Sequence, residues 1–331
     1  MGNIALGLNS LSNVRFGDNQ ISSVYLGTNL VWSSYNYILD LYPTSVHHAF
    51  SLRKLRTAYT GACLRIRRTT TTPSVTTTTV DVSFNSLNTI GLDSAITYVS
   101  GTATTAINLG QFCASVVNGY SNPDGVNTNQ DIFVVTWFDQ SGNGKNPTQA
   151  TAGLQPRLVN LGNLETSGGK VAVRFVKASS TSLNIVDATA NINNMSSYFV
   201  GAFVGSTNGQ VGYNLGGASN RFYFPYLNTN IFAGYGASAT AITLETGFNT
   251  NRKLYELISP LPGSTTLAQG WTNGAAQGTR AIVNASTANI TLGTITTNYY
   301  DGYIQEIIGW QSNANRLEKE TNINSYWTIY V

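Results

Sequence analysis

The chain has 331 residues, of which 10% are charged and 42% are hydrophobic, and its formal net charge is +3. Low charge together with enough apolar residues for a core excludes an intrinsically disordered chain. No apolar run is long enough to span a bilayer, and the first ten residues lack the charged start and apolar stretch of a signal peptide. We therefore expect synthesis in a cytoplasm and no membrane insertion.

A short repeat occupies the first 32 residues. Gly-x-Asn recurs every ten residues, at 7–9, 17–19 and 27–29. Gly and Asn tolerate positive φ, so we expect three strands of about six residues joined by tight turns. Three such strands bury little surface. Residues 1–32 are therefore predicted to be a docking module, the alternative being a meander on the main domain. The apolar residues expected to dock are Val14, Phe16, Val24, Leu26, Val31 and Trp32.

A linker is predicted over residues 33–46 and a single main domain over 47–331. The start of this domain is basic, because six of the 18 Lys and Arg residues lie between positions 53 and 68. LRIR at 64–67 alternates apolar and basic residues, which is typical of a half-buried strand whose arginines pair locally or face solvent. A surface for an anionic partner is the alternative. No base-reading groups accompany the arginines, so we expect no nucleic-acid partner.

Short strands dominate the rest of the chain, and two helices interrupt them. The threonine-rich stretch 69–82 is interpreted as a hairpin or an exposed loop. The first helix is expected at 105–117, with Ile107, Phe112 and Val116 on one face. The second is expected at 314–326, with Leu317, Ile323 and Tyr326 inward and Arg316, Glu318, Lys319 and Glu320 toward solvent. The expected strands are 62–67, 132–138, 171–176, 198–204, 221–227, 253–258, 267–272, 279–283, 289–293 and 302–310.

Few residues suggest metal or redox chemistry. Cys63 and Cys113 are expected to be free, buried thiols, because a cytoplasm is reducing. The loop DQSGNG at 139–144 has the oxygen-rich composition of a calcium loop, but we favour a turn in which Asp139 caps its own backbone. Whether Asp139 and Asn143 hold a cation stays open. We expect no metal site and no cofactor.

Two segments of the sequence resemble a known protein family. HHAFSLRKLRTAYTGACLRIRR at 47–68 and VVTWFDQSGNGKNPTQA at 134–150 are followed by LQPRLV at 154–159 and GGKVAVRFV at 168–176. In this order they resemble the catalytic domain of the α-L-arabinofuranosidase B family. The resemblance covers about residues 45 to 180 and then fades to a general concanavalin A-like pattern. It implies an all-β fold, a concanavalin A-like jelly-roll sandwich with few short helices.

The catalytic carboxylates of that family are not found here. A retaining glycosidase needs a nucleophile and an acid/base. The family's nucleophile is a Glu in an Asp-x-Glu phrase, whereas the matching segment 222–236 contains no acid. The family's acid/base Asp follows a strand ending in Leu-Gly, and here Leu292-Gly293 is followed by TITTN. We therefore expect no catalytic residues and no enzyme activity. The alternative is a hydrolase with relocated carboxylates, for which Asp301 and Glu306 are the candidates.

Aromatic residues fall where the resemblance places the substrate cleft. Aromatic faces suit sugar rings, although tyrosines also pack on sheet faces and at subunit contacts. The residues expected to bind a glycan are Tyr213, Tyr223, Tyr226, Tyr235 and Trp271.

These observations predict a non-catalytic phage virion surface protein. VYLGTNLVW at 24–32 resembles segments of phage tail and fibre proteins, which favours a head fibre, a decoration protein or a tail-associated receptor-binding protein. The expected partners are other virion proteins through the N-terminal module, further copies in a homo-oligomer (a trimer by analogy), and host surface glycans. The alternatives are the glycoside hydrolase and a free carbohydrate-binding module.

Overall fold

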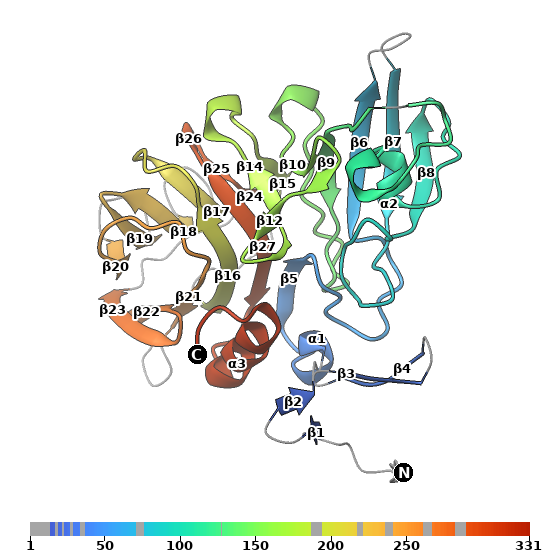
Figure 1. The fold of residues 1–331 in the computed structure, drawn as a ribbon. Helices are drawn as coiled ribbons and strands as arrows, with labels where there is room; N and C mark the ends of the chain where they lie inside the picture. Colours follow the sequence, from blue (N-terminus) through green and yellow to red (C-terminus); the bar gives the residue numbers. More distant parts are fainter. Residues whose placement is uncertain are drawn as a thin grey trace.

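The protein is an all-β sandwich with few helices, as expected, and it is described here from a computed structural model (Figure 1). Most of the main domain is described, and so are four short strands before it. The described residues are 14–16, 19–21, 23–26, 29–33, 37–70, 76–126, 128–186, 194–216, 221–235, 241–260, 267–281 and 289–331.

The larger of two sheets has 13 described strands, in the order β23-β22-β21-β16-β27-β14-β10-β9-β6-β7-β8, with β5 paired to β27 and β11 paired to β10. Its neighbouring strands are antiparallel. The strands are β5 (Val46–Ser51), β6 (Leu64–Thr70), β7 (Thr76–Val82), β8 (Ile96–Gly101), β9 (Ile132–Trp137), β10 (Arg157–Asn160), β11 (Asn163–Leu164), β14 (Val173–Phe175), β16 (Met195–Phe203), β21 (Lys253–Ser259), β22 (Leu267–Thr272), β23 (Ala275–Ala281) and β27 (Gly302–Trp310).

The smaller sheet has six described strands in the order β15-β24-β17-β18-β19-β20. They are β15 (Leu183–Val186), β17 (Gln210–Gly216), β18 (Arg221–Asn228), β19 (Asn230–Tyr235), β20 (Ala241–Glu245) and β24 (Asn289–Leu292). Four two-stranded pairs complete the β structure: β1 (Val14–Phe16) with β2 (Asn19–Ile21), β3 (Ser23–Leu26) with β4 (Asn29–Ser33), β12 (Thr166–Ser167) with β13 (Lys170–Val171), and β25 (Thr294–Ile295) with β26 (Asn298–Tyr299). Each of the ten expected strands overlaps one of these strands.

Aromatic side chains fill the space between the two sheets. Phe199 of β16 contacts Phe224 of β18, and Tyr300 packs against Phe175, Phe199 and Phe203. All nine residues of β16 are buried. Phe199 faces the smaller sheet, whereas Tyr198 packs against Trp310 of β27, and Lys319 of α3 (Arg316–Trp327) lies over that Trp310 ring. Backbone hydrogen bonds between Thr148 and Asn184 link β15 to the segment beside β9, which joins the sheets at one end.

Helix α3 confirms the predicted C-terminal helix but turns a different face inward. Ile323 is buried as expected. Leu317 is 60% exposed, whereas Lys319 and Glu320 are buried. The prediction for these three residues was wrong, because α3 packs on polar groups of β21 and on the ring of Trp310 as well as on apolar side chains.

The predicted helix at 105–117 is much shorter in the structure. The α-helix α2 covers Leu109–Phe112, and a 3₁₀ turn follows at Val116–Asn118. Phe112 is buried as expected, but Ile107 and Val116 are 68% and 53% exposed. Asn108 caps α2 by accepting a hydrogen bond from the backbone N–H of Gln111, so the helix begins at Leu109 and Ile107 lies outside it. Two further 3₁₀ turns lie at Ala152–Leu154 and Lys177–Ser179.

The main domain begins before residue 47. Helix α1 (Ile38–Leu41) lies within the predicted linker, and Ile38 and Leu39 are fully buried. The backbone N–H of Leu39 donates to the carbonyl of Leu55 at 2.9 Å, and Trp310 Nε1 donates to the carbonyl of Tyr42 at 3.0 Å. Residues from about 37 onward therefore belong to the sandwich rather than to a linker.

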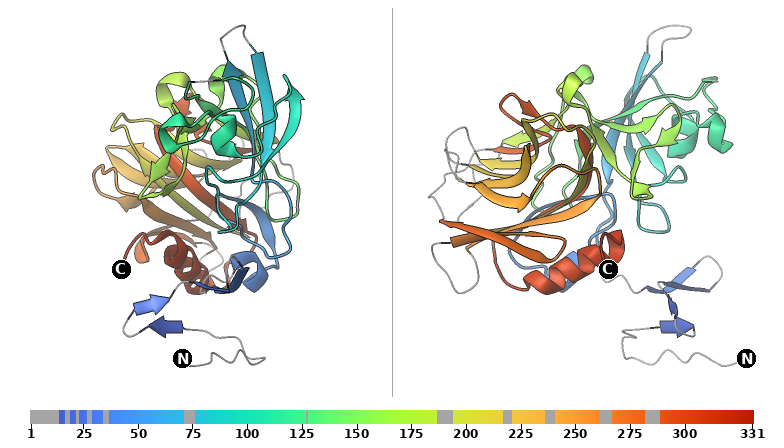
Figure 2. Two further views of the ribbon diagram at one scale, coloured as in Figure 1. Left: turned by 45° about the vertical axis from the view of Figure 1, so that its right-hand side comes forward. Right: turned by 60° about the vertical axis from the view of Figure 1, so that its left-hand side comes forward.

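The N-terminal repeat forms two hairpins instead of three strands. β1 pairs with β2 across the Gly-x-Asn at 17–19, and β3 pairs with β4 across the one at 27–29. The segment between the second and third Gly-x-Asn therefore contributes to both hairpins, Ile21 to the first and Ser23–Leu26 to the second. Neither hairpin joins the sheets of the sandwich, and both lie on the side of the sandwich where α1 is found (Figure 1), as the further views also show (Figure 2). The side chains proposed to dock lie outside the described part of the structure.

The basic start of the domain pairs locally, as one of the two interpretations expected. Arg65 contacts Asp81 at 2.7 Å, Arg68 contacts Asp124 at 3.3 Å, and Arg67 donates to Gln155. The threonine-rich stretch is a hairpin of β6 and β7, with Thr70 opposite Thr76. Cys63 and Cys113 are buried free thiols, as predicted.

Candidate functional site

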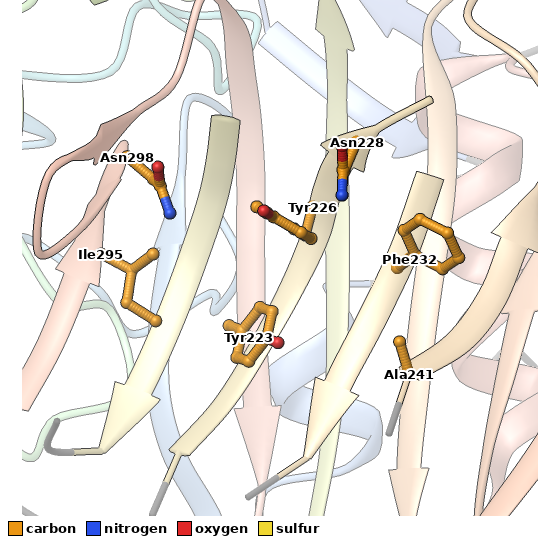
Figure 3. Close-up of a pocket in the computed structure, with 7 residues that line it drawn as sticks. All are labelled: Tyr223, Tyr226, Asn228, Phe232, Ala241, Ile295 and Asn298. Atoms are coloured by element: carbon orange, nitrogen blue, oxygen red, sulfur yellow. The ribbon is translucent and has the colours of Figure 1, made fainter. Parts of the chain in front are cut away.

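A cavity of about 340 Å³ lies on the smaller sheet, beside the β25–β26 hairpin. We call it the tyrosine cavity. Strands β18, β19 and β20 form one side of it, and the β25–β26 hairpin forms the other, with Tyr223 and Tyr226 between them (Figure 3). The residues that line it are Tyr223, Tyr226, Asn228, Phe232, Ala241, Ile295 and Asn298.

A shift in strand register lets two tyrosines share this cavity. Residues three apart in a regular strand point to opposite faces. The pairing of β18 with β19 is irregular between Tyr223 and Tyr226, and both side chains line the cavity. Their ring centroids are 5.7 Å apart, and the rings are nearly perpendicular at 86°. The cavity therefore has two aromatic walls that meet at a right angle.

The polar groups of the tyrosine cavity are carboxamides and phenol hydroxyls. Asn228 and Asn298 lie on opposite sides of the rings (Figure 3). Neither carboxamide makes a hydrogen bond within the described part of the chain, so each can donate and accept toward a ligand. No charged side chain is among the seven lining residues. A neutral ligand with hydroxyl groups and one apolar face suits this wall.

Tyr213, Trp271 and Tyr235, which were also predicted to bind a glycan, are not among the lining residues. Tyr213 is fully buried, with its hydroxyl 2.9 Å from His48 Nε2, so the prediction of a ligand contact is corrected to a core position. Trp271 is 6% exposed, and the guanidinium of Arg316 covers its ring at 4.6 Å, so the same correction applies. The side chain of Tyr235 lies outside the described residues.

The two segments that the resemblance associates with catalysis line this one cavity. Segment 222–236 supplies Tyr223, Tyr226, Asn228 and Phe232, and the TITTN segment supplies Ile295 and Asn298. The sequence therefore contained a signal for Asn298 and Ile295, because it had already marked TITTN as the acid/base position. Ala241 had no such signal, since only the fold brings β20 to this wall.

The candidate relocated carboxylates lie elsewhere and are engaged in ion pairs. Glu306 is fully buried, and its carboxylate accepts hydrogen bonds from Arg53 at 2.7 and 3.0 Å and from Ser51 at 2.6 Å. Asp301 accepts from Arg174 at 2.6 Å. Neither carboxylate lines the tyrosine cavity, so the pair does not form an acid/base and nucleophile set there.

The DQSGNG loop has the geometry of a capped turn. Asp139 accepts hydrogen bonds from the backbone N–H groups of Ala49, Ser141 and Lys145, and from the hydroxyl of Ser141. Asn143 turns its amide nitrogen toward the carbonyl of Val46 at 2.8 Å. Donor hydrogens thus surround the Asp139 oxygens, which is the turn arrangement that we favoured from the sequence. Burial nevertheless raises the pKa of Asp139.

The two neighbouring histidines are part of the core. His47 Nδ1 lies 2.8 Å from His48 Nδ1, and the hydroxyl of Tyr213 continues this chain of hydrogen bonds. It links β5 of the large sheet to β17 of the small sheet. All three side chains are buried, so these hydrogen bonds belong to the core between the two sheets.

Comparisons with known proteins support the fold. No protein-family model and no curated protein matches the sequence. The structure is similar to an arabinofuranosidase in complex with arabinofuranosyl-α-1,2-xylobiose (TM-score 0.53, 16% identity, 87% of this chain and 64% of that one). It is also similar to a GH54 α-L-arabinofuranosidase soaked with a cyclic sulfate inhibitor (TM-score 0.52, 16% identity, 89% and 65%). The chain thus spans less than two thirds of these proteins, and the likeness confirms the jelly-roll sandwich.

Proposed function

We propose that this chain is a non-catalytic glycan-binding protein that holds a neutral sugar ring in the tyrosine cavity. The observation that carries the proposal is the composition of the wall, in which two half-buried tyrosines and two unengaged carboxamides occur without a charge. Tyrosine rings stack on the apolar face of a sugar, and carboxamides hydrogen-bond its hydroxyls. The arabinofuranosidase with the similar fold was crystallised with an arabinofuranosyl-xylobiose, which supports a pentose-containing ligand as a first probe.

Binding to a glycan array tests this proposal. We expect the full chain to bind neutral glycans and Tyr226→Ala to lose at least about tenfold in affinity, because stacking on an aromatic face contributes on the order of 1–2 kcal/mol. Tyr98→Ala, which removes an exposed tyrosine of β8, is the matched control and should bind like the unchanged protein. A blank array, or equal losses in both variants, would contradict the proposal.

The absence of catalysis is part of the proposal and has its own assay. None of the seven lining residues is a carboxylate, so the pair of acids that most glycosidases use is not found among them. We expect aryl α-L-arabinofuranosides and related aryl glycosides to show no turnover. Turnover that disappears in Asp301→Ala or Glu306→Ala would instead establish the hydrolase with relocated carboxylates.

We further propose that the protein is exposed on the surface of a phage-like particle and docks there through residues 1–32. The support is the resemblance of residues 24–32 to phage fibre segments, together with two hairpins that are not paired to the sandwich sheets. Deletion of residues 1–32 should abolish incorporation into particles while glycan binding persists. Incorporation of the truncated chain would refute this docking role. None of the helices in the described residues has the length and apolar character needed to cross a bilayer.

A further inference from the structure

A second cavity lies where four segments of the chain meet. The turn between β12 and β13, the start of β21, the turn between β22 and β23, and the residues after α3 form its wall. Its volume is about 390 Å³, and it shares no lining residue with the tyrosine cavity. We call it the cationic groove. Its lining residues are Gly168, Asn251, Arg252, Lys253, Asn273, Thr328 and Ile329.

Arg252 supplies a fixed positive charge to this groove. Its Nη1 donates to the carbonyl of Ser167 at 2.9 Å, and its Nη2 donates to the carbonyls of Trp327 and, at 3.2 Å, Thr328. The backbone lies close to the guanidinium, because a Cβ at Gly168 would be 2.6 Å from Arg252 Cζ. All of these acceptors are neutral carbonyls, so they hold the guanidinium in place without neutralising it.

Lys170 of β13, two residues after the lining residue Gly168, carries a second positive charge next to the groove, although it is not one of the seven lining residues. Its Nζ lies 4.7 Å from the ring centroid of Tyr326, and Arg53 lies over the same ring. Glu306 neutralises Arg53, but no carboxylate pairs with Lys170 or Arg252 in the described part of the chain. Burial lowers the pKa of Lys170, and the charges of Arg252 and Arg53 lower it further.

The rest of the wall offers hydrogen-bond donors and no acid. Asn273 Oδ1 accepts from the backbone N–H of Leu254 at 3.0 Å, which leaves its Nδ2 as the group available to a ligand. Lys253 pairs with Glu245 at 3.2 Å, so this pair adds no net charge. The seven lining residues include neither a carboxylate nor an aromatic ring. The groove therefore has charged residues and no aromatic ring, whereas the tyrosine cavity has aromatic rings and no charged residue.

We propose that the cationic groove is a second ligand site and that it binds an oxyanion, such as the carboxylate or sulfate of an acidic sugar. Two surplus cations attract the negative charge, and amide donors at the wall orient its oxygens. This site is independent of the neutral-sugar site, so either can exist without the other.

Titration of the full chain with three small probes tests the site. We use D-glucuronate, inorganic sulfate and D-glucose at low ionic strength, followed by calorimetry or NMR. We expect one or both anions to bind with a roughly millimolar Kd and glucose to bind at least about fivefold more weakly. Glucuronate alone would identify a carboxylated sugar as the ligand class, and sulfate alone would identify a sulfate-like oxyanion.

Charge-removing variants decide whether the groove is responsible. Lys170→Gln should weaken anion binding about fivefold and preserve the fold, because Lys170 Nζ makes no hydrogen bond within the described residues. Arg252→Gln should weaken it at least as much, although it also removes the clamp on the end of α3. Arg280→Gln, at the exposed end of β23, is the control and should change nothing. The proposal is overturned if neither anion binds saturably, if glucose binds equally well, or if Arg280→Gln has the same effect as Lys170→Gln.

Discussion

At the scale of single residues, the tyrosine cavity depends on a close contact between one tyrosine ring and the backbone of a glycine. The ring of Tyr223 lies against the backbone of Gly234 on the neighbouring strand β19, and an ideal Cβ at Gly234 would be 2.0 Å from Tyr223 Cζ. Any side chain at position 234 would therefore displace the ring. Glycine is required here for space, because the residue faces a large aromatic group directly across the strand pair.

We expect Gly234→Ala to weaken glycan binding and to destabilise the protein by about 1–3 kcal/mol, because the new methyl group overlaps the Tyr223 ring. Gly278→Ala on β23 is the matched control, since its Cβ would meet Ile242 at an ordinary 3.7 Å. Urea denaturation and glycan titration of both variants check the expectation. Equal stability of the two variants would show that the ring can move without penalty.

A second feature at this scale is a buried glutamate whose pKa is raised. Glu256 is fully buried, and its Oε2 accepts a hydrogen bond from Arg316 Nη1 at 2.9 Å. The same guanidinium also forms an ion pair with Glu320, so a single cation pairs with two carboxylates. Burial and then the charge of Glu320 raise the pKa of Glu256 to about 8, against the opposing effect of Arg316. Tyr330 donates to Glu320, and the hydroxyl of Tyr198 is buried nearby.

The raised pKa of Glu256 predicts a loss of stability as the pH rises. Between the ordinary glutamate pKa of 4.5 and about 8, the folded state holds a proton that the unfolded state has released. The free energy of unfolding should therefore fall across this window, by at most roughly 1.4 kcal/mol per pH unit. Glu256→Gln should flatten the slope, whereas Glu318→Gln, at an exposed position, should retain it. Denaturation at pH 5, 6, 7 and 8 measures the slopes, and identical slopes would refute the assignment.

At the scale of elements, α3 shows how a helix docks through charge as well as apolar contact. Lys319 is buried with its Nζ 4.4 Å from the ring centroid of Trp310, and it donates to the carbonyl of Ala314. Burial lowers the pKa of Lys319 to about 8. The inward face therefore comprises Lys319, Glu320, Ile323 and Trp327, offset from the face that apolar residues alone would indicate.

Two truncations on α3 test which face is inward. We expect Ile323→Ala to destabilise the protein by about 2–4 kcal/mol, because it leaves a cavity in a fully buried position. Leu317→Ala, on the same helix but 60% exposed, should change stability by less than about 0.5 kcal/mol. Thermal or chemical denaturation compares them, and similar losses in both variants would contradict the observed orientation of the helix.

At the scale of the whole molecule, the sandwich is held together without the N-terminal hairpins. The large and small sheets share an aromatic core, and the hydrogen bonds around Thr148 join them at one end. β1 to β4 pair among themselves and not with these sheets. Stability of the main domain should therefore be a property of residues from about 37 onward.

Deletion of residues 1–32 should leave the melting temperature within about 2 °C of that of the full chain, because it removes no strand of the large sheet or of the smaller sheet. Circular dichroism and a thermal melt check this directly. A deletion from 1 to 42, which also removes α1 with the buried Ile38 and Leu39, is the contrasting variant and should lose much more stability. A large loss in the shorter deletion would show that the hairpins stabilise the sandwich.

Local patterns in the sequence predicted the strands, and they also showed that the two segments lining the tyrosine cavity contain no acid. Alternation of apolar and polar residues indicated ten strands, and phrases such as WFDQSGNG indicated the sandwich. The lack of acids in segment 222–236 and in TITTN is readable directly from the residues. These properties depend on neighbours along the chain or on residue identity, so they need no tertiary information.

The tertiary structure decided which side chains meet. Tyr213 and Trp271 have the same residue types as binding residues, but packing between layers buried the first and Arg316 covered the second. Lys319 and Glu320 looked like solvent residues, yet partners distant in the sequence draw them inward. The cationic groove joins residues from 168 to 329, so no local pattern could indicate it. Burial and charge pairing depend on residues that are distant in the sequence and meet only in the folded structure. For that reason a local stretch of sequence does not predict them.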